Sequence, residues 1–225
     1  MVMPILSGPG RGLLWVTGSG THGCWLGTYE RDRQQQLTQL LRSGDCFLDI
    51  GANVGFYSLL ASRIVGKEGC VHAFEPFPRN VEYITRHIEM NRITNIEIHP
   101  IALSDGEDRR MSFSISTNPS AGHLSENSDG PEQISVPVAA LDSLWRKSAF
   151  PSPSMMKIDV EGAEYSVLNG GKEMIAACRP VILLAGHGSA VQERCCDLLR
   201  SWSYRIKIDR NGSLDGMYES TAWPN

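Results

Sequence analysis

Glycines and acidic side chains follow two short apolar runs of the sequence, where they could form a binding site. Gly51 and Gly55 come directly after the run Cys46–Ile50, so bare backbone there can approach a ligand closely. The carboxylate of Asp49 would repel a pyrophosphate but attract an ammonium or a sulfonium group. Glu75 ends the next apolar run and has two oxygens that can accept hydrogen bonds from both hydroxyls of a ribose. Together these residues predict an adenosine ligand that carries positive charge, as S-adenosylmethionine does.

A dinucleotide is the alternative ligand for such a loop. Its fingerprint requires glycine at the first, third and sixth positions, whereas this chain has Asn53 at the third and Phe56 at the sixth. A nicotinamide-dependent oxidoreductase is therefore the disfavoured alternative. Taken singly, Asp49 could cap a helix and Glu75 could lie on the surface. Their combination with the two glycines favours the ligand site.

A second group of ionisable residues follows later apolar runs. Transfer of a methyl group from a sulfonium is an in-line displacement, so a protein must align the acceptor, and an acceptor such as a hydroxyl must also lose its proton. Asp159 is the first choice for this catalytic role because it ends a predicted central strand, and the further candidates are Glu161, His187 and, less favoured, Glu164. Acids at the start of a helix also offset its dipole, which is the ordinary role expected of Glu164 and the alternative for Glu161. For His187 the alternative is a histidine that is merely hydrogen-bonded in a loop.

Lys157 lies in an otherwise apolar predicted strand, where an ammonium group is costly unless it is paired. We expect it to pair with Asp159 or Asp49, or else to extend its amine to the end of the strand. The His, Cys and carboxylate residues show no spacing along the sequence that is typical of a metal site, so no metal ion is expected.

From Cys46 onward, short apolar runs alternate with segments of helical period, which is typical of an α/β fold with a parallel sheet. Gly66 and Pro76 stand where predicted elements end. The predicted strands are Cys46–Ile50, 71–75, 96–102, 155–159, 181–184 and 204–209, and the predicted helices are Phe56–Val65, 80–91, 164–177 and 195–202.

Three further segments depart from this alternation. Residues 111–116 and 134–139 alternate with a two-residue period and predict an inserted β-hairpin, whose polar connection 117–133 is a candidate substrate loop. At the C-terminal end, a tight turn at 211–212 and an antiparallel return strand over 213–218 are expected. Residues 1–36 are predicted to be an N-terminal extension that packs on a core domain formed by 37–225.

Length and composition indicate one ordinary soluble domain: 225 residues, 41% hydrophobic and 20% charged. The net charge of -4 and the lack of a Lys/Arg cluster argue against nucleic acid as a partner. Six scattered cysteines without a Cys-x-x-Cys pair favour a reducing compartment. Neither a signal peptide nor a membrane span is predicted, so a cytoplasmic location is expected.

Four sequence blocks resemble those of the FkbM family of methyltransferases, both in their residues and in their order along the chain. They are DIGANVG (49–55), AFEPFPRN (73–80), ALSD (102–105) and KIDVEGAE (157–164), and the resemblance covers roughly 27–184. It implies the Rossmann-like, seven-stranded sheet of class I methyltransferases, mostly parallel with one antiparallel strand. It also implies S-adenosylmethionine as the cofactor, S-adenosylhomocysteine as the product, and a hydroxyl of a small molecule, sugar or glycolipid as the acceptor. Methyl transfer to carbon or nitrogen from the same donor site is the alternative.

The resemblance also assigns roles to residues at the matching positions. The methionine end of the donor is assigned to Asp49, Gly51, Asn53 and Gly55, the ribose to Glu75, and the adenine to Ala102, Leu103 and Ser104. Ala52, Pro76 and Asn80 complete the predicted cofactor-binding set. One departure is Ala185, which stands where the family usually carries Glu. Either His187 takes part of that role or the substrate differs.

Overall fold

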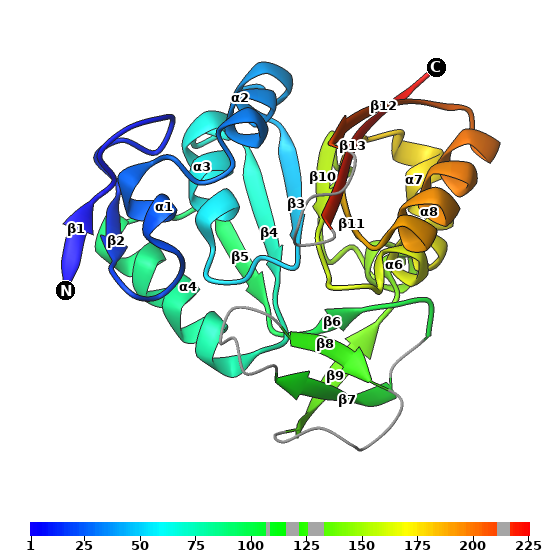
Figure 1. The fold of residues 1–225 in the computed structure, drawn as a ribbon, viewed down its shortest axis with the longest axis horizontal. Helices are drawn as coiled ribbons and strands as arrows, with labels where there is room; N and C mark the ends of the chain where they lie inside the picture. The colour runs from blue at the N-terminus through cyan, green and yellow to red at the C-terminus, as the bar shows by residue number, and fades with distance from the viewer. Residues whose placement is uncertain (107–108, 116–121, 126–132, 211–216) are drawn as a thin grey trace. The chain divides into compact units, whose positions relative to one another are not determined.

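The computed structural model describes residues 1–106, 109–115, 122–125, 133–210 and 217–225. The chain divides into two compact units, Met1–Pro100 and Ile101–Asn225 (Figure 1). None of the helices in the described ranges is long and apolar enough to cross a membrane.

The first unit is built on three parallel strands in the order β3-β4-β5. Its strands are β1 (Val2–Pro4), β2 (Leu14–Val16), β3 (Cys46–Ile50), β4 (Cys70–Phe74) and β5 (Ile96–His99), and its helices are α1 (His22–Leu26), α2 (Arg31–Leu40), α3 (Phe56–Val65) and α4 (Pro78–Asn91). Every residue of β3 is buried, which explains its continuous apolar run. The predicted strand–helix–strand unit over β3, α3 and β4 is confirmed.

The segment before β3 is attached to α4. Trp15 is completely buried and stacks on His87, with ring centroids 4.1 Å apart. The backbone N–H of Val16 donates to Nε2 of His87 (3.1 Å), so the proton of this ring is on Nδ1, which donates to the carbonyl of Val54 (3.0 Å). Burial lowers the pKa of His87 to about 4, so the ring stays neutral in this position. His87 thereby links the N-terminal segment around Trp15 to the loop after β3 that contains Gly51 and Gly55, called the glycine loop below.

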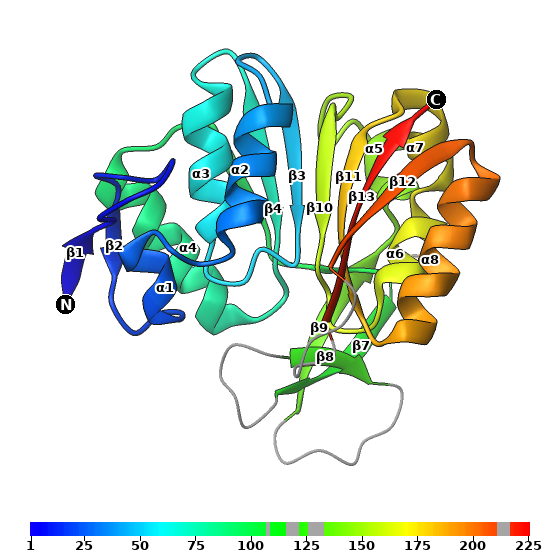
Figure 2. The same cartoon turned by 45° about the horizontal axis from the view of Figure 1, so that its top comes forward.

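The second unit contains four strands in the order β12-β13-β11-β10. They are β10 (Met155–Ile158), β11 (Val181–His187), β12 (Tyr204–Arg210) and β13 (Met217–Pro224), and the helices of this unit are α5 (Leu141–Arg146), α6 (Glu164–Gly170), α7 (Lys172–Cys178) and α8 (Ser189–Ser201). Strands β10 and β11 are parallel, whereas β13 is antiparallel to both of its neighbours. Helices α6, α7 and α8 lie beside these strands (Figures 1 and 2). The three strands β3–β5 and these four are the seven predicted, and β13 is the predicted antiparallel strand.

A separate four-stranded sheet of the second unit confirms the inserted hairpin. Its strands are β6 (Ala102–Leu103), β7 (Arg109–Ile115), β8 (Gly122–Ser125) and β9 (Gln133–Ala139), in the order β6-β9-β7-β8. Strands β7 and β9 pair antiparallel, as the alternation predicted. The expected substrate loop 117–133 falls largely outside the described residues, except that 122–125 form β8. That part of the expectation was wrong, because backbone pairing with β7 makes a strand from a polar sequence.

Several predicted boundaries were also wrong. Helix α8 begins at Ser189 rather than at 195, and β11 continues to His187 rather than ending at 184. The strand expected over 96–102 ends at His99, because Pro100 has no N–H for a ladder, and Ala102 and Leu103 pair with β9 instead. The helix expected over 164–177 is two helices, α6 and α7, with Gly171 between them. The return strand begins at Met217 rather than at 213, and the turn expected at 211–212 lies outside the described residues.

Candidate functional site

The loop between β3 and α3 has an unusual backbone that explains its residue types. Gly51, Asn53 and Gly55 have φ values of 75°, 51° and 85°, in the left-handed region that favours Gly and Asn. The N–H groups of Gly51 and Ala52 both donate to the carbonyl of Phe74 at the end of β4, each at 3.0 Å. Gly55 is the N-cap of α3. The loop therefore turns tightly and offers backbone, rather than side chains, next to a helix N-terminus.

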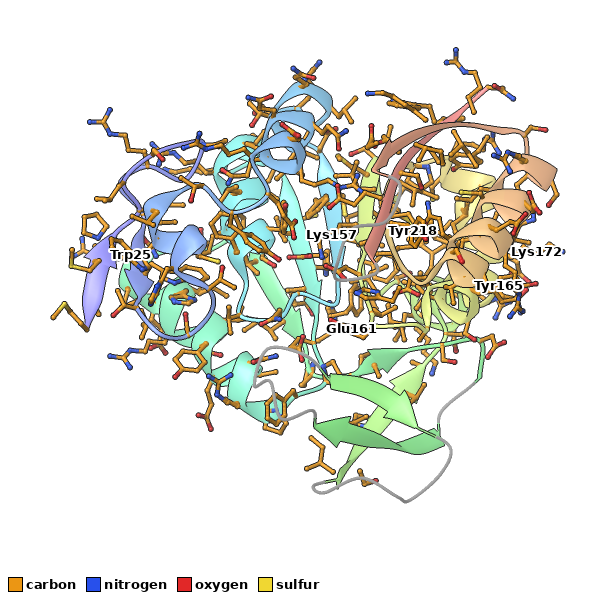
Figure 3. The ribbon with its side chains drawn as sticks, in the orientation of Figure 1. Trp25, Lys157, Glu161, Tyr165, Lys172 and Tyr218 are labelled. Carbon is orange, nitrogen blue, oxygen red and sulfur yellow. The ribbon has the colours of Figure 1, made fainter. Side chains whose placement is uncertain are left out.

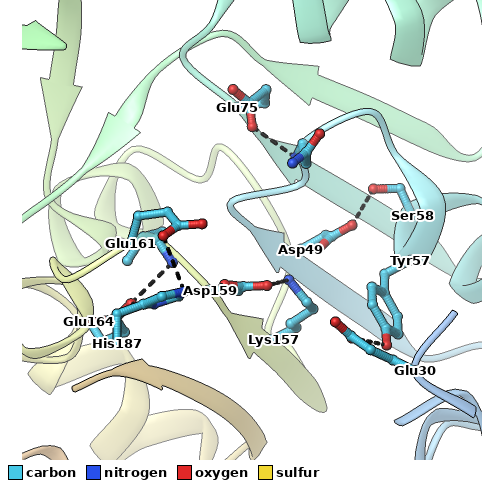
Figure 4. Close-up of polar contacts among 12 residues, drawn as sticks. Glu30, Asp49, Tyr57, Ser58, Glu75, Lys157, Asp159, Glu161, Glu164 and His187 are labelled. Carbon is cyan, nitrogen blue, oxygen red and sulfur yellow. Dashed lines mark hydrogen bonds and ion pairs between the residues drawn. The ribbon is translucent and has the colours of Figure 1, made fainter. Parts of the chain in front are cut away.

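Glu75 follows β4 and is held in a single orientation by this loop. Its Oε2 accepts a hydrogen bond from the N–H of Asn53 (2.8 Å; Figure 4), and its Oε1 accepts one from the N–H of Phe77 (2.9 Å). The side chain of Asn80 bonds to it as well. Burial raises the pKa of Glu75 to about 7, although these hydrogen bonds oppose the shift. Since a carboxylate has about four lone-pair sites, these three bonds leave room for a hydrogen bond from one ribose hydroxyl rather than from both.

Asp49 is completely buried near the end of β3. The hydroxyl of Ser58, one turn into α3, donates to its Oδ2 at 2.5 Å (Figure 4). A buried carboxylate is costly unless positive charge or hydrogen-bond donors stabilise it. The chemistry of these residues, two buried carboxylates beside bare backbone, fits the ammonium, sulfonium and ribose groups of S-adenosylmethionine and does not fit a pyrophosphate.

The other predicted cofactor residues have mixed environments. Ala52 is buried, Pro76 is half-buried, and Asn80 is buried in the first turn of α4. The three residues assigned to adenine, Ala102, Leu103 and Ser104, are buried in the second unit. The N–H of Ser104 donates to the carbonyl of Ala139 (3.0 Å) and its hydroxyl to Asp105 (3.2 Å). Their contact with adenine stays a prediction.

The second unit brings together the three predicted catalytic residues. Strands β10 and β11 pair in parallel with Ile158 opposite Leu184, so their carboxyl ends lie at the same edge. There, Nε2 of His187 lies 3.2 Å from Oε2 of Glu161 and 3.7 Å from Oδ1 of Asp159 (Figure 4).

The predicted pairing of Lys157 is confirmed with Asp159. Lys157 is buried, and its Nζ lies 3.0 Å from Oδ2 of Asp159. Lys157 and Glu161 are both labelled in Figure 3. An ammonium at this distance stabilises the ionised form of the Asp159 carboxyl.

Glu164 also belongs to this cluster, although the sequence analysis favoured a helix-dipole role for it over a place in the site. Its side chain is completely buried, and Oε1 accepts from the N–H groups of Gly162 (3.0 Å) and Val160 (3.3 Å), as expected of an acid in the first turn of a helix. The same oxygen lies 2.9 Å from Nδ1 of His187. The available signal was its place in a short segment that already carried two other acids.

His187 is surrounded by negative charge. Burial alone would lower its pKa, but the hydrogen bond to Glu164 and the charges of Asp159 and Glu161 raise the pKa to about 9. Glu161 itself has a φ of 54°, a left-handed conformation that is strained for a residue other than Gly and that is common at functional sites. At neutral pH, His187 is therefore a cation among carboxylates.

Comparison with solved structures defines the class of fold. The FkbM methyltransferase of Methylobacillus flagellatus aligns with a TM-score of 0.59 and 14% identity, over 91% of this chain and 56% of that one. Fibrillarin from Aeropyrum pernix, solved with bound S-adenosyl-L-methionine, aligns with a TM-score of 0.52 and 14% identity, over 82% of this chain and 68% of that one. Identities this low show the fold alone, and the predicted Rossmann-like class I methyltransferase fold is confirmed.

Sequence comparison then gives the family. The family model for the methyltransferase FkbM domain matches residues 49–206, so the chain belongs to the FkbM methyltransferase family. One relative is the hexuronic acid methyltransferase AglP of Haloferax volcanii, 26% identical over 155 residues, which are 68% of this chain and 61% of that protein. Another is the 2-O-methyltransferase NoeI of Sinorhizobium fredii, 30% identical over 162 residues, which are 64% of this chain and 65% of that protein. The match spans less than two thirds of either relative.

Proposed function

We propose that this chain transfers the methyl group of S-adenosylmethionine to a hydroxyl oxygen of a sugar or another small molecule. The observation that carries the proposal is the geometry of Glu75, whose carboxylate is buried and held by the N–H groups of Asn53 and Phe77 directly beside the glycine loop. Family membership supports methyl transfer. The acceptor class rests on two relatives, whose names specify hexuronic acid and 2-O methylation.

The donor residues have separate tasks in this proposal. A ribose hydroxyl donates to the remaining acceptor site of Glu75, while Asp49 stabilises the positive charge of the methionine end. Gly51, Asn53 and Gly55 keep side chains away from the bound donor because of their backbone conformation. Bound S-adenosylmethionine supplies an electrophilic methyl group, so the chain itself must align the acceptor and take its proton.

The acceptor tasks fall to the cluster of the second unit. Because His187 is protonated at neutral pH in the metal-free chain, it cannot be the group that accepts the hydroxyl proton there. Asp159, which Lys157 holds in place by an ion pair, is our choice for positioning the hydroxyl and receiving its proton, with Glu161 close to the same histidine. Ala185, which lies in β11 two residues before His187, leaves the acceptor contact to the longer side chains of this cluster.

Isothermal titration calorimetry tests the donor site. The wild-type chain is expected to bind S-adenosylhomocysteine and to give no heat with NAD. Glu75→Ala should weaken the binding of S-adenosylhomocysteine by at least about tenfold, since it removes charged hydrogen-bond acceptors worth roughly 1.5–3 kcal/mol. Glu68→Ala is the matched control, because Glu68 is an exposed residue of the same unit. Absence of S-adenosylhomocysteine binding by the folded wild type would refute the proposal.

A further inference from the structure

We infer that the second unit holds a divalent metal ion at the carboxyl ends of β10 and β11, bound by Asp159, Glu161 and His187. Each residue offers one ligand atom, and the three atoms all lie within 4.8 Å of one another. Ligand atoms about 2.1 Å from one metal lie roughly 3–4 Å apart, so only small side-chain shifts are needed. The site itself rests on this geometry, whereas its role in catalysis rests on the proposed methyl transfer.

The partners of His187 prepare it as a metal ligand. With a proton on Nδ1, the ring donates to Oε1 of Glu164 (2.9 Å), which directs the lone pair of Nε2 toward Glu161 and Asp159. A histidine ligand whose other nitrogen donates to a carboxylate is the usual arrangement around protein-bound metals. Glu164 is oriented in turn by the N–H groups of Val160 and Gly162.

A buried acceptor in the same cluster is an independent indication. The side chain of Glu164 is completely buried, yet its Oε2 receives no hydrogen bond from any residue in the described part of the chain. Leaving such an oxygen without a donor costs about 1–3 kcal/mol or more. Water bound to a metal ion is a strong donor and could supply the missing hydrogen bond. Nε2 of His187 is likewise buried, and it faces the carboxylates of Glu161 (3.2 Å) and Asp159 (3.7 Å).

The charge of the cluster matches a divalent cation. Asp159, Glu161 and Glu164 carry three negative charges and Lys157 carries one positive charge, so the four side chains sum to -2 when His187 is neutral. A divalent ion neutralises this charge and displaces the proton from Nε2 into solvent. Two carboxylates and one imidazole favour Mn²⁺ or Zn²⁺ over Mg²⁺ and Ca²⁺, which prefer oxygen ligands alone. Bound to an acceptor hydroxyl, such an ion would make its proton easier to remove.

A second group in the first unit provides an internal comparison. Side chains of His72, Glu97 and His99 also lie close enough to share an ion. There, however, Nδ1 of His72 is 2.9 Å from Nε2 of His99, so the two rings use each other as hydrogen-bond partners, and the nearest Glu97 contacts are 3.7 and 3.9 Å. No buried carboxylate orients either ring among the contacts described for this group. The group of His72, Glu97 and His99 therefore serves as the control for the proposed metal site.

Titration of Mn²⁺ into the chelator-treated full chain, followed by electron paramagnetic resonance and calorimetry, tests the inference. The wild type is expected to bind one Mn²⁺ per chain, and its melting temperature should rise when Mn²⁺ is bound. Asp159→Asn, Glu161→Gln and His187→Gln should each weaken Mn²⁺ binding by at least about tenfold. His99→Gln should bind Mn²⁺ like the wild type.

Three results would overturn the inference: no saturable Mn²⁺ binding, unchanged binding in all three variants, or loss of binding in His99→Gln alone. Circular dichroism shows whether each variant is folded, and Glu161→Gln, whose side chain is 38% exposed, keeps the test available if a more buried variant fails to fold. S-adenosylhomocysteine is titrated into the same samples. If the chain binds S-adenosylhomocysteine but does not bind Mn²⁺, only the metal site is refuted. If it binds Mn²⁺ but not S-adenosylhomocysteine, only the proposed donor site is refuted.

Discussion

At the scale of single residues, Glu75 combines two properties that are usually separate. Its carboxyl is buried, which raises its pKa to about 7, and it is held by two backbone N–H groups, which fix its orientation. A ribose hydroxyl that donates a hydrogen bond to this carboxylate would stabilise its ionised form, so binding of the ligand should lower the pKa of Glu75. In the proposed donor site, the protonation of Glu75 is therefore expected to be coupled to the affinity for the donor.

This coupling predicts a pH dependence of S-adenosylhomocysteine binding. Below pH 7 the free chain carries a proton on Glu75 that must leave when the ligand binds, so affinity falls as the pH falls. We expect about a tenfold loss from pH 8 to pH 6, and proton release at pH 6.5. Calorimetry in two buffers of different ionisation enthalpy measures both. A Glu75→Gln chain should lose the dependence, and an equal slope in that variant would show that another group titrates.

At the scale of elements, the start of α3 depends on a residue without a side chain. Gly55 has a φ of 85°, and a Cβ atom there would lie 3.1 Å from Cγ1 of Ile84 on α4. Gly44 has a nearly identical φ of 86°, but its Cβ would meet nothing within 4 Å. The two glycines therefore separate the cost of the backbone conformation from the cost of the contact.

We predict that Gly55→Ala is more destabilising than Gly44→Ala. Both substitutions force a residue with a Cβ into the left-handed region, at about 1–2 kcal/mol. Only Gly55→Ala also crowds Ile84, which should add about 1 kcal/mol or more to the loss in the free energy of unfolding. Urea denaturation of both variants measures the difference. Equal losses would mean that α4 adjusts to the added methyl group at no cost.

At the scale of the molecule, the N-terminal segment contacts the glycine loop through His87. Trp15 packs on His87, and His87 donates to the carbonyl of Val54 within that loop. Residues far apart in the chain are thereby joined into one packed group of the first unit. Leu14 makes a two-way pair with Asn91 through its backbone, with distances of 2.7 and 2.9 Å, and its side chain is 37% exposed.

Trp15→Ala is accordingly expected to lower the free energy of unfolding by about 3–5 kcal/mol, the usual cost of removing a large buried aromatic side chain. Leu14→Ala removes a partly exposed side chain and leaves its backbone pair with Asn91 in place, so it should cost less than about 1 kcal/mol. Urea denaturation measures both changes. Trp15→Ala also removes the stacking partner of His87, which holds the carbonyl of Val54 in the glycine loop, so the variant should bind S-adenosylhomocysteine more weakly. Unchanged affinity would show that the position of Val54 does not depend on Trp15.

Local pattern alone predicted much of the fold and the residues of the candidate donor site. β3 and α3 have the boundaries predicted from the apolar run and the helical period. The glycine loop and Glu75 were also found from sequence, because strand ends and left-handed residues leave signals within a few positions. The end of β5 at His99 was missed, although Pro100 was a visible reason for it.

The sequence by itself determined the α/β pattern, the glycine loop, the candidate acids and the family resemblance. Only the tertiary structure decided that Glu164 orients His187 and that Asp159, Glu161 and His187 can share a cation, which the sequence spacing did not suggest. The physical reason is that β10 and β11 pair in parallel, so residues 159 and 187 meet at one edge although a helical crossover separates them along the chain. Contacts between strand ends depend on pairing and register, which no local pattern contains.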